Sequence, residues 1–329
     1  MTPLTDRFGR VHRDLRLSLT DRCSLRCRYC MPAEGLPWTP AAKLLTTGEL
    51  LQLVGIATEL GVREVRLTGG EPLLRPDAAE IVAGIVALPE QPEVSLTTNG
   101  LRLAAVADAL VAAGLRRVNV SLDTLDRTTF KKLTLRDRLP DVLAGIAAAR
   151  AAGLQPIKVN AVLIRGVNDH EAPALLQWAL GNGLRLRFIE QMPLDPQHSW
   201  DRATMITREE ILRSLCEAGY AVTPAAGRGS APAEEFLVDG GPGRVGIVGS
   251  VTKPFCAACD RVRLTADGQW RSCLFAAGER DLRTPLRAGA GRTELAALMS
   301  AEVKAKKPGH GLDDPGFLQP DRPMSAIGG

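Results

Sequence analysis

Aromatic side chains are scarce in this 329-residue chain, since Phe, Trp and Tyr together make up 4 % of it. A buried core must therefore be built mainly from aliphatic side chains. An excess of one charge is also lacking, because 41 Lys and Arg residues stand against 37 Asp and Glu residues. The net charge of +4 does not predict a surface for nucleic acid or another large polyanion. A small anionic ligand needs only local positive charge, which this balance permits.

Long hydrophobic runs are absent as well. Even residues 81–88 offer only eight apolar positions, against about 20 in a membrane-crossing helix. Residues 1–10 contain no apolar segment of the kind found in secretion signals. Seven cysteines without such a signal indicate a reducing compartment, where thiols serve metals or catalysis more often than disulfides. We expect a cytoplasmic protein with no nucleic-acid or membrane partner. The 45 % hydrophobic content excludes a disordered chain.

Short strand-like segments alternate with helical ones between residues 14 and 192, which is typical of repeated βα units and a parallel sheet. The helical segments repeat apolar residues with a period near 3.6, and several end before a glycine. Six such units predict an α/β fold with a partial (βα)6 TIM-like barrel. The expected strands are Leu15–Thr20, Glu64–Thr68, Val94–Thr98, Arg117–Leu122, Gln155–Leu163 and Leu184–Glu190; the expected helices are Thr47–Leu60, Pro76–Leu88, Leu103–Ala113, Leu139–Ala152 and Glu171–Leu180.

A second region begins after about Tyr220, where a turn-rich loop at residues 224–233 precedes several short strand candidates. We therefore divide the chain into a barrel, residues 1–222, and a C-terminal extension, residues 223–329. Residues 304–329 are rich in Lys, Pro and Gly, and we expect an irregular tail of a kind that is usually disordered.

One face of the expected strands is polar. In an ordinary parallel barrel both faces are apolar, so this alternation predicts an interior that is wet or filled by a polar ligand. For any single residue, a solvated position at the strand end is an equally good explanation. Recurrence in six strands favours a substrate cavity. The polar set is Arg16, Ser18, Thr20, Arg66, Thr68, Ser95, Thr97, Asn99, Asn119, Ser121, Asp123, Lys158, Asn160, Arg185 and Arg187.

Six of the seven cysteines form two groups of three. Cys23, Cys27 and Cys30 follow the first expected strand, and Cys256, Cys259 and Cys273 lie in the C-terminal extension. Thiolates so closely spaced favour zinc or iron–sulfur ligation, and three ligands rather than four indicate a missing distant ligand or a metal with an open position. Cys216 lies in an expected helix, Arg208–Glu217, where we expect a buried apolar role for it.

The sequence CSLRCRYC at residues 23–30 resembles the cluster loop of the radical S-adenosylmethionine (SAM) superfamily. The sequence GGEP at residues 69–72 follows at the end of the second expected strand, as in that superfamily. Glycines there would let the backbone approach the methionine moiety of SAM closely.

Further motifs along nearly the whole chain are similar to the GTP 3′,8-cyclase family of molybdenum-cofactor biosynthesis. They are GR at 9–10, LR at 15–16, YCMP at 29–32, RLTGGEPLLR at 66–75, TTNG at 97–100, VSLD at 120–123, FIEQMP at 188–193, PFC at 254–256, CDRVRL at 259–264 and GG at 328–329. One departure is Ser24, which stands where that family usually has Asn; it could alter hydrogen bonding around the loop without removing a ligand.

The resemblance implies a role for each matching residue. Two [4Fe-4S] clusters are expected, the first binding SAM and the second binding the guanine of GTP through an open iron. Cys23, Cys27 and Cys30 would hold the first cluster, and Cys256, Cys259 and Cys273 the second. Tyr29, Gly70, Ser121 and Met192 would contact SAM; Arg16, Arg66, Thr97, Lys158, Arg261, Val262 and Arg263 would contact GTP; the Gly328–Gly329 tail would insert toward the active site. The alternative to GTP binding for Arg66 is an ion pair with a nearby carboxylate such as Glu71.

The implied reaction is the cyclisation of GTP to 3′,8-cyclo-7,8-dihydro-GTP, the first step of molybdenum-cofactor biosynthesis. A 5′-deoxyadenosyl radical from SAM would remove hydrogen from ribose C3′, and the C3′ radical would attack C8 of guanine. The implied partners are an external electron donor of the flavodoxin or ferredoxin type, a downstream pyranopterin monophosphate synthase, and a second copy of the chain in a homodimer. No acid–base pair among the side chains is required.

Two alternatives remain. A peptide-modifying radical SAM enzyme with an auxiliary cluster is the nearest, although such enzymes commonly carry more cysteines in that region. A non-enzymatic iron–sulfur or zinc protein is the other, but it leaves the polar cavity and the GGEP sequence unexplained.

Overall fold

Six parallel strands, arranged as an open barrel, form the centre of the computed structural model, which describes residues 1–328. They pair in chain order, each with the next. Their bounds are β1 (Asp14–Ser18), β2 (Glu64–Thr68), β3 (Glu93–Thr98), β4 (Arg117–Ser121), β5 (Ile157–Val162) and β6 (Arg185–Ile189). The predicted strands are therefore confirmed to within two residues at each end. The partial (βα)6 barrel is confirmed with them.

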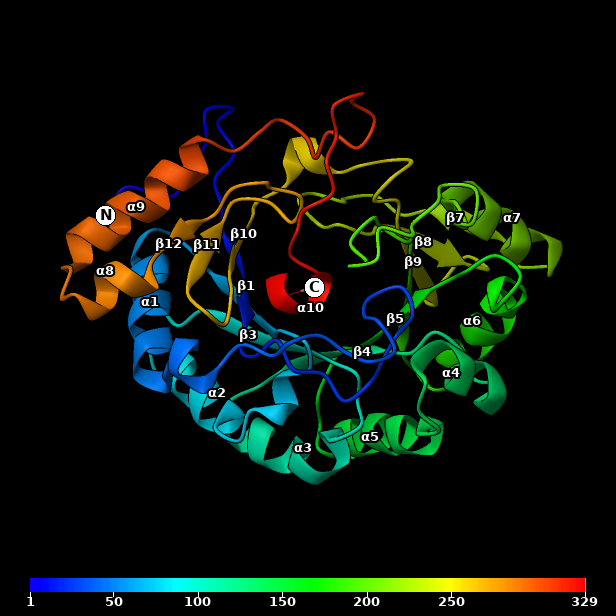
Figure 1. Cartoon of the computed structure of the whole chain (residues 1–329). Coiled ribbons are helices and arrows are strands. Elements are labelled where there is room, and N and C mark those ends of the chain that lie inside the picture. Colours follow the sequence, from blue (N-terminus) through cyan, green and yellow to red (C-terminus); the bar gives the residue numbers. More distant parts are fainter. Residues whose placement is uncertain (329) are drawn as a thin grey trace.

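Helices cover the outside of this barrel (Figure 1). They are α1 (Thr47–Glu59), α2 (Ala78–Val86), α3 (Leu103–Ala112), α4 (Arg127–Thr134), α5 (Leu139–Ala151), α6 (Ala172–Gly181) and α7 (Arg208–Glu217). Two of them begin with a capping box, in which Thr46 and Glu49 close the start of α1 and Thr207 and Glu210 that of α7. Helix α4 was not predicted from the sequence, because it is short and mostly polar and buries only Phe130, Leu133 and Thr134.

The apolar faces of the strands lie under these helices. Val65, Leu67, Val118 and Val120 are fully buried in one continuous aliphatic core. The opposite faces point into the barrel, as the alternation along the sequence predicted.

The C-terminal region adds strands to both edges of the same sheet. On the β1 edge, β10 (Arg261–Leu264) pairs parallel with β1, followed by antiparallel β11 (Gln269–Arg271) and β12 (Arg280–Asp281). On the other edge, β9 (Arg244–Val248) pairs parallel with β6, followed by antiparallel β8 (Glu234–Val238) and β7 (Val222–Pro224). Both edges of the open barrel are thus extended by later segments of the chain.

The remaining elements are short or peripheral. They are η1 (Ala41–Lys43), η2 (Pro72–Leu74), η3 (Asp169–Glu171), η4 (Cys256–Ala258), α8 (Arg283–Arg287), α9 (Arg292–Lys304) and α10 (Met324–Ile327). None of the helices in residues 1–328 has both the length and the apolarity needed to cross a bilayer. Cys216 on α7 is exposed, so the expectation that it is a buried apolar residue is wrong. The buried face of α7 is formed instead by Ile211 and Leu215.

The end of the chain is irregular, as predicted, since residues 305–323 contain no helix or strand, but it is packed against the barrel rather than loose. It runs to the middle of the barrel, where α10 lies with Ser325 and Ile327 buried (Figure 1). Arg322 holds it there through ion pairs of 2.8 Å to both Asp267 and Glu279. These ion pairs could not be predicted from the sequence, because both carboxylates lie more than 40 residues from Arg322. The composition of the segment by itself therefore suggested disorder.

Candidate active site

A cavity of about 1030 Å³, its open mouth included, lies inside the barrel. Both the barrel strands and the C-terminal region line it. The polar and sulfur-bearing residues at its wall are Arg16, Arg66, Thr97, Asn160, Arg187, Met192, Ser250, Cys256, Cys259, Arg261, Arg263, Ser272, Cys273, His310 and Met324. The polar strand face and the second group of cysteines therefore share one compartment.

Strand register places three guanidinium groups in a row. Arg263 on β10 is the partner of Arg16 on β1, which is the partner of Arg66 on β2. Adjacent strands are about 4.8 Å apart, and like charges directly opposite one another are destabilising. Asp14 offsets part of this repulsion by accepting from the Arg16 guanidinium at 2.8 Å. The row nonetheless carries more positive than negative charge, which favours an anionic ligand.

Further along the sheet, Lys158 and Arg187 extend the positive charge. Burial lowers the pKa of Lys158 to about 7, and the neighbouring Arg187 and Arg117 push the pKa in the same direction. Burial likewise lowers the pKa of Arg263 to about 9, with Arg261 and Arg16 adding to the effect. The neighbouring cations thus disfavour each other's charged forms in the free protein, and a bound polyanion would raise these pKa values again.

The alternative pairing of Arg66 with Glu71 does not occur. Arg66 donates from Nε to Ser95 Oγ at 3.2 Å. Glu71 is fully buried and accepts from the Thr98 hydroxyl and the Asn99 backbone N–H, each at 2.7 Å. The guanidinium of Arg66 is therefore available to a ligand.

The loop with the first three cysteines packs against the two glycines at the end of β2. A Cβ on Gly69 would clash with the Thr20 carbonyl, and one on Gly70 with the Arg22 carbonyl. Gly69 also has φ +144°, in the region that favours glycine. The close approach is sealed by a hydrogen bond of 2.7 Å from Gly70 N–H to Thr20 O. GGEP therefore positions the cluster loop.

Side chains from β3 and β4 complete the surroundings of this loop. Asn99 donates through its Nδ2 to Ser24 Oγ at 3.0 Å and lies 3.8 Å from Cys23 Sγ. Ser24 is thus integrated into the loop's hydrogen bonding. The Tyr29 hydroxyl donates to Asp123 at 2.7 Å. Burial raises the pKa of Asp123 to about 6, although this hydrogen bond opposes the rise.

The thiols in each group lie near one another. Burial raises the pKa of Cys30 to about 12, and Cys23 adds to the rise. Burial also raises the pKa of Cys256, to which Cys273 and Cys259 contribute. Cys259 differs: burial would raise the pKa of its thiol, but Arg261 and Lys306 outweigh this effect and lower it.

The chemistry of these thiols suits iron–sulfur ligation. In residues 1–328, no three Cys, His, Asp or Glu side chains are grouped closely enough to share one metal ion. Soft thiolates in threes suit a [4Fe-4S] cluster whose remaining iron is open to a ligand.

The structure brings nine of the predicted site residues together in the cavity wall. Those lining the cavity are Arg16, Arg66, Thr97, Met192, Arg261, Arg263, Cys256, Cys259 and Cys273. Those placed outside its wall are Lys158, Val262, Tyr29, Gly70, Ser121, Cys23, Cys27 and Cys30. Val262 is fully buried in the apolar core, so only its backbone could reach a ligand.

The predicted tail contact is present for Gly328, whose carbonyl accepts from the Arg263 guanidinium. A Cβ on Gly328 would lie 2.5 Å from Thr68 Oγ1 and 3.2 Å from Ser18. Gly329 lies outside the described residues. The end of the chain therefore reaches the barrel between β1, β2 and β10.

Arg187 and Asn160 line the cavity but had no assigned ligand role. Their alternation with apolar residues in β5 and β6 had placed them on the polar face. The sequence could not show which residues are neighbours across the sheet. Asn160 pairs with Arg187, and Arg187 pairs with Gly246, whose lack of a side chain leaves space for the side chain of Arg187.

Comparison with known proteins defines the class. Residues 17–179 match the family model described as the radical SAM superfamily, and residues 184–312 match the model described as Molybdenum Cofactor Synthesis C. With the open parallel barrel and the Cys23–Cys30 loop, these matches establish a radical SAM enzyme.

The nearly full-length relatives then define the family. The chain is 60 % identical over 329 residues to a GTP 3′,8-cyclase of Streptomyces coelicolor, covering 99 % of this chain and 96 % of the relative. It is 55 % identical to a GTP 3′,8-cyclase of Mycolicibacterium smegmatis, covering 99 % and 92 %. The chain belongs to the GTP 3′,8-cyclase family, as the motifs predicted.

Solved structures show the same fold at much lower identity. Streptococcus suis SuiB bound to S-adenosylmethionine has a TM-score of 0.56 and 13 % identity, covering 91 % of this chain and 68 % of SuiB. SuiB bound to its precursor peptide SuiA has a TM-score of 0.51 and 19 % identity, covering 64 % and 46 %. This likeness is one of fold.

Proposed function

We propose that the chain cyclises GTP to 3′,8-cyclo-7,8-dihydro-GTP in the first step of molybdenum-cofactor biosynthesis. The observation that carries the proposal is the excess of cations in a cavity that also holds the second group of cysteines. Such a wall suits a ligand with several negative charges at one end and a metal-binding base at the other.

The row Arg263–Arg16–Arg66, with Lys158 and Arg187, would hold the triphosphate. Guanidinium groups suit phosphate because they donate two parallel hydrogen bonds in a planar geometry. Arg261, which lies 4.3 Å over the Phe255 ring, is fixed near Cys259 and would contact the nucleoside. Thr97 lines the same wall and supplies an uncharged hydroxyl.

Cys23, Cys27 and Cys30 would hold a [4Fe-4S] cluster with SAM bound near Gly70, Tyr29, Ser121 and Met192. This pair, when bound, supplies the 5′-deoxyadenosyl radical. Residues of the chain fix its surroundings: the glycines at the end of β2 let backbone approach, and Asp123 orients the Tyr29 hydroxyl.

Cys256, Cys259 and Cys273 would hold a second [4Fe-4S] cluster, with one iron left for the guanine. These thiols lie in the wall that also contains Arg261 and Arg263. Substrate held by its phosphates along the row Arg263–Arg16–Arg66 would therefore have its base directed toward these thiols.

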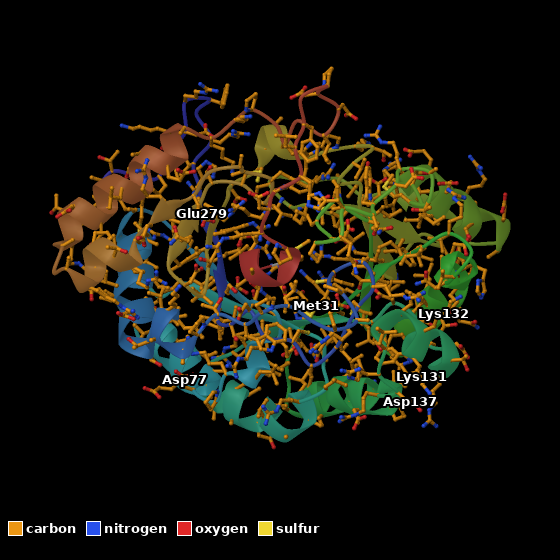
Figure 2. All side chains as sticks on the ribbon, viewed as in Figure 1. Met31, Asp77, Lys131, Lys132, Asp137 and Glu279 are labelled. Atoms are coloured by element: carbon orange, nitrogen blue, oxygen red, sulfur yellow. The ribbon has the colours of Figure 1, made fainter. Side chains whose placement is uncertain are left out.

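The last residues would shield the reaction. Met324 lines the cavity, and Gly328 is held by Arg263. In Figure 2, Met31 lies toward the middle of the ring, where it is buried. Excluding solvent and other hydrogen donors is the chief protein contribution that radical chemistry requires.

An external electron donor of the flavodoxin or ferredoxin type would dock beside α4. The last turn of α4 is joined to the cluster loop by hydrogen bonds from Arg26 N–H to Thr134 O at 2.9 Å and from Arg28 N–H to Leu133 O at 3.0 Å. Exposed cations surround this junction: Arg28, Lys131, Lys132 and Arg136. Lys131 and Lys132 lie at the outer rim in Figure 2. An acidic donor would fit this surface.

The remaining partners follow from the same reaction. The unstable product calls for a downstream pyranopterin monophosphate synthase, and we place both proteins in the cytoplasm, where reductants keep the thiols free. We further propose a homodimer, which equilibrium sedimentation would test directly.

The test is an anaerobic assay of protein reconstituted with iron and sulfide and supplied with SAM and a strong reductant. We expect 5′-deoxyadenosine to form in amounts that depend on GTP, together with a GTP isomer of unchanged mass. Formation of 5′-deoxyadenosine in the same amount with and without GTP would contradict the proposal. Peptides would then be the next substrates to test.

A further inference from the structure

Lys306 is a buried cation to which the proposed reaction gives no task. It lies two residues beyond the end of α9 and is 4 % exposed. Its ammonium donates to the Arg261 carbonyl at 2.9 Å and lies 3.6 Å from Cys259 Sγ, within hydrogen-bond distance of a sulfur. Burying an ammonium costs free energy that anions or acceptors must offset. A neutral thiol would offset little of this free-energy cost, whereas a negatively charged, cluster-bound thiolate would offset much of it.

The position of Lys306 contrasts with that of its neighbour in sequence. The adjacent Lys307 is exposed, so the chain places one lysine against the sulfur and the next in solvent.

The backbone near Lys306 is fixed rather than loose. Arg10 donates to the carbonyls of Cys256 at 2.6 Å, Lys307 at 2.8 Å and Pro308 at 2.9 Å. Asp6 holds Arg10 through an ion pair of 2.6 Å. The N-terminal segment thereby ties the cysteine loop to the residues that follow α9, and the distance from Lys306 to Cys259 is a consequence of this tie.

Two of the candidate ligands consequently differ. Cys256 accepts a backbone N–H from His310, whereas Cys259 lies beside two cations, Arg261 and Lys306, and accepts hydrogen bonds from the backbone and side chain of Arg261. Positive charge and hydrogen bonds at ligand sulfurs stabilise the reduced, more negative state of an iron–sulfur cluster and raise its reduction potential.

We propose that Lys306 is a positioning residue of the second cluster, which holds the Cys259 thiolate in place by a hydrogen bond and raises the reduction potential of the cluster bound there. This inference rests on the proposed second cluster. It concerns that cluster's electronic properties and not the binding of SAM or GTP.

The experiment uses the full-length chain with Cys23, Cys27 and Cys30 replaced by Ser, so that signals arise from the second cluster alone. After anaerobic reconstitution with iron and sulfide, iron content and the midpoint potential are measured in a redox titration followed by electron paramagnetic resonance. Lys306→Met, Lys306→Gln, Lys306→Arg and the matched control Lys307→Met are compared in this parent.

We expect the midpoint potential to fall in Lys306→Met and Lys306→Gln, to return close to the parent value in Lys306→Arg, and to stay unchanged in Lys307→Met. If Lys306→Met binds no iron, Lys306→Gln carries the comparison, because its amide still donates without charge. A cluster with the parent potential in the uncharged variants overturns the inference, as does an equal fall in Lys307→Met. A parent that binds no iron instead overturns the proposed second cluster itself.

Discussion

We predict that Lys158 makes GTP binding sensitive to pH. Its pKa of about 7 in the free protein means that the ammonium form prevails below pH 7 and the neutral form above it. A bound triphosphate favours the ammonium, so binding takes up a proton above pH 7. We expect GTP affinity to fall about tenfold or more between pH 6.5 and 8.5, as measured by calorimetry.

Lys158→Met is the matched comparison, because it leaves the titration of the nucleotide itself unchanged. This variant should bind GTP more weakly at pH 6.5 and lose most of the pH dependence. An equally steep pH dependence in Lys158→Met would show that another group takes up the proton.

Glu71 has a structural task that can be tested without any cofactor. Its buried carboxylate accepts from Thr98, Asn99 and Leu73, so its removal leaves three donors without an acceptor. We expect Glu71→Ala to lose about 2–4 kcal/mol in free energy of unfolding, measured by urea denaturation of the apoprotein. The exposed Glu34→Ala is the control. Equal stability of both variants would contradict this role.

Single residues of the site were predictable where a motif or strand alternation marked them. Arg16 and Arg66 were marked by both, and both line the cavity. The partners of Arg322 and Lys306 were not predictable, because their contacts join positions tens of residues apart. A motif match alone placed the Val262 side chain wrongly among the GTP contacts. Alternate residues in a strand point to opposite faces, and the Val262 side chain points into the apolar core.

At the scale of elements, the second group of cysteines lies in and after η4 and in the turn after β11, far along the chain from the first cysteine loop. Replacing Cys256, Cys259 or Cys273 with Ser should therefore leave the first cluster and SAM cleavage with a strong reductant in place. Cyclisation of GTP should be lost. Iron content, 5′-deoxyadenosine and the GTP isomer are the measurements. Full cyclisation in any of these variants would contradict the assignment of the substrate site.

The basic surface of α4 gives a prediction about electron delivery. Lys131→Glu with Lys132→Glu should slow reduction of the first cluster by a flavodoxin or ferredoxin about tenfold at low salt, with a smaller effect at high salt. Reduction by titanium(III) citrate should be unchanged. The control is Lys304→Glu with Lys307→Glu, at the end of α9 on the other side of the ring (Figure 1). Equal slowing in the control would contradict docking at α4.

At the scale of the whole molecule, the sequence was sufficient to predict the six-stranded barrel but not the strands that extend its two edges. Local periodicity marks β1–β6 and most of their helices, because those patterns lie within short segments. The pairing of β10 with β1 and of β9 with β6 joins distant parts of the chain. The same is true of α10, which lies inside the barrel although its composition suggested a loose end.

The positive wall of the open barrel is proposed above all to hold a triphosphate. The most direct test is equilibrium binding of GTP and of guanosine to the reconstituted protein, with wild-type chain and Arg66→Ala. We predict that GTP binds far more tightly than guanosine, and that Arg66→Ala weakens GTP about 10–100-fold without affecting SAM. Equal affinity for GTP and guanosine, or unchanged GTP affinity in Arg66→Ala, would contradict the account.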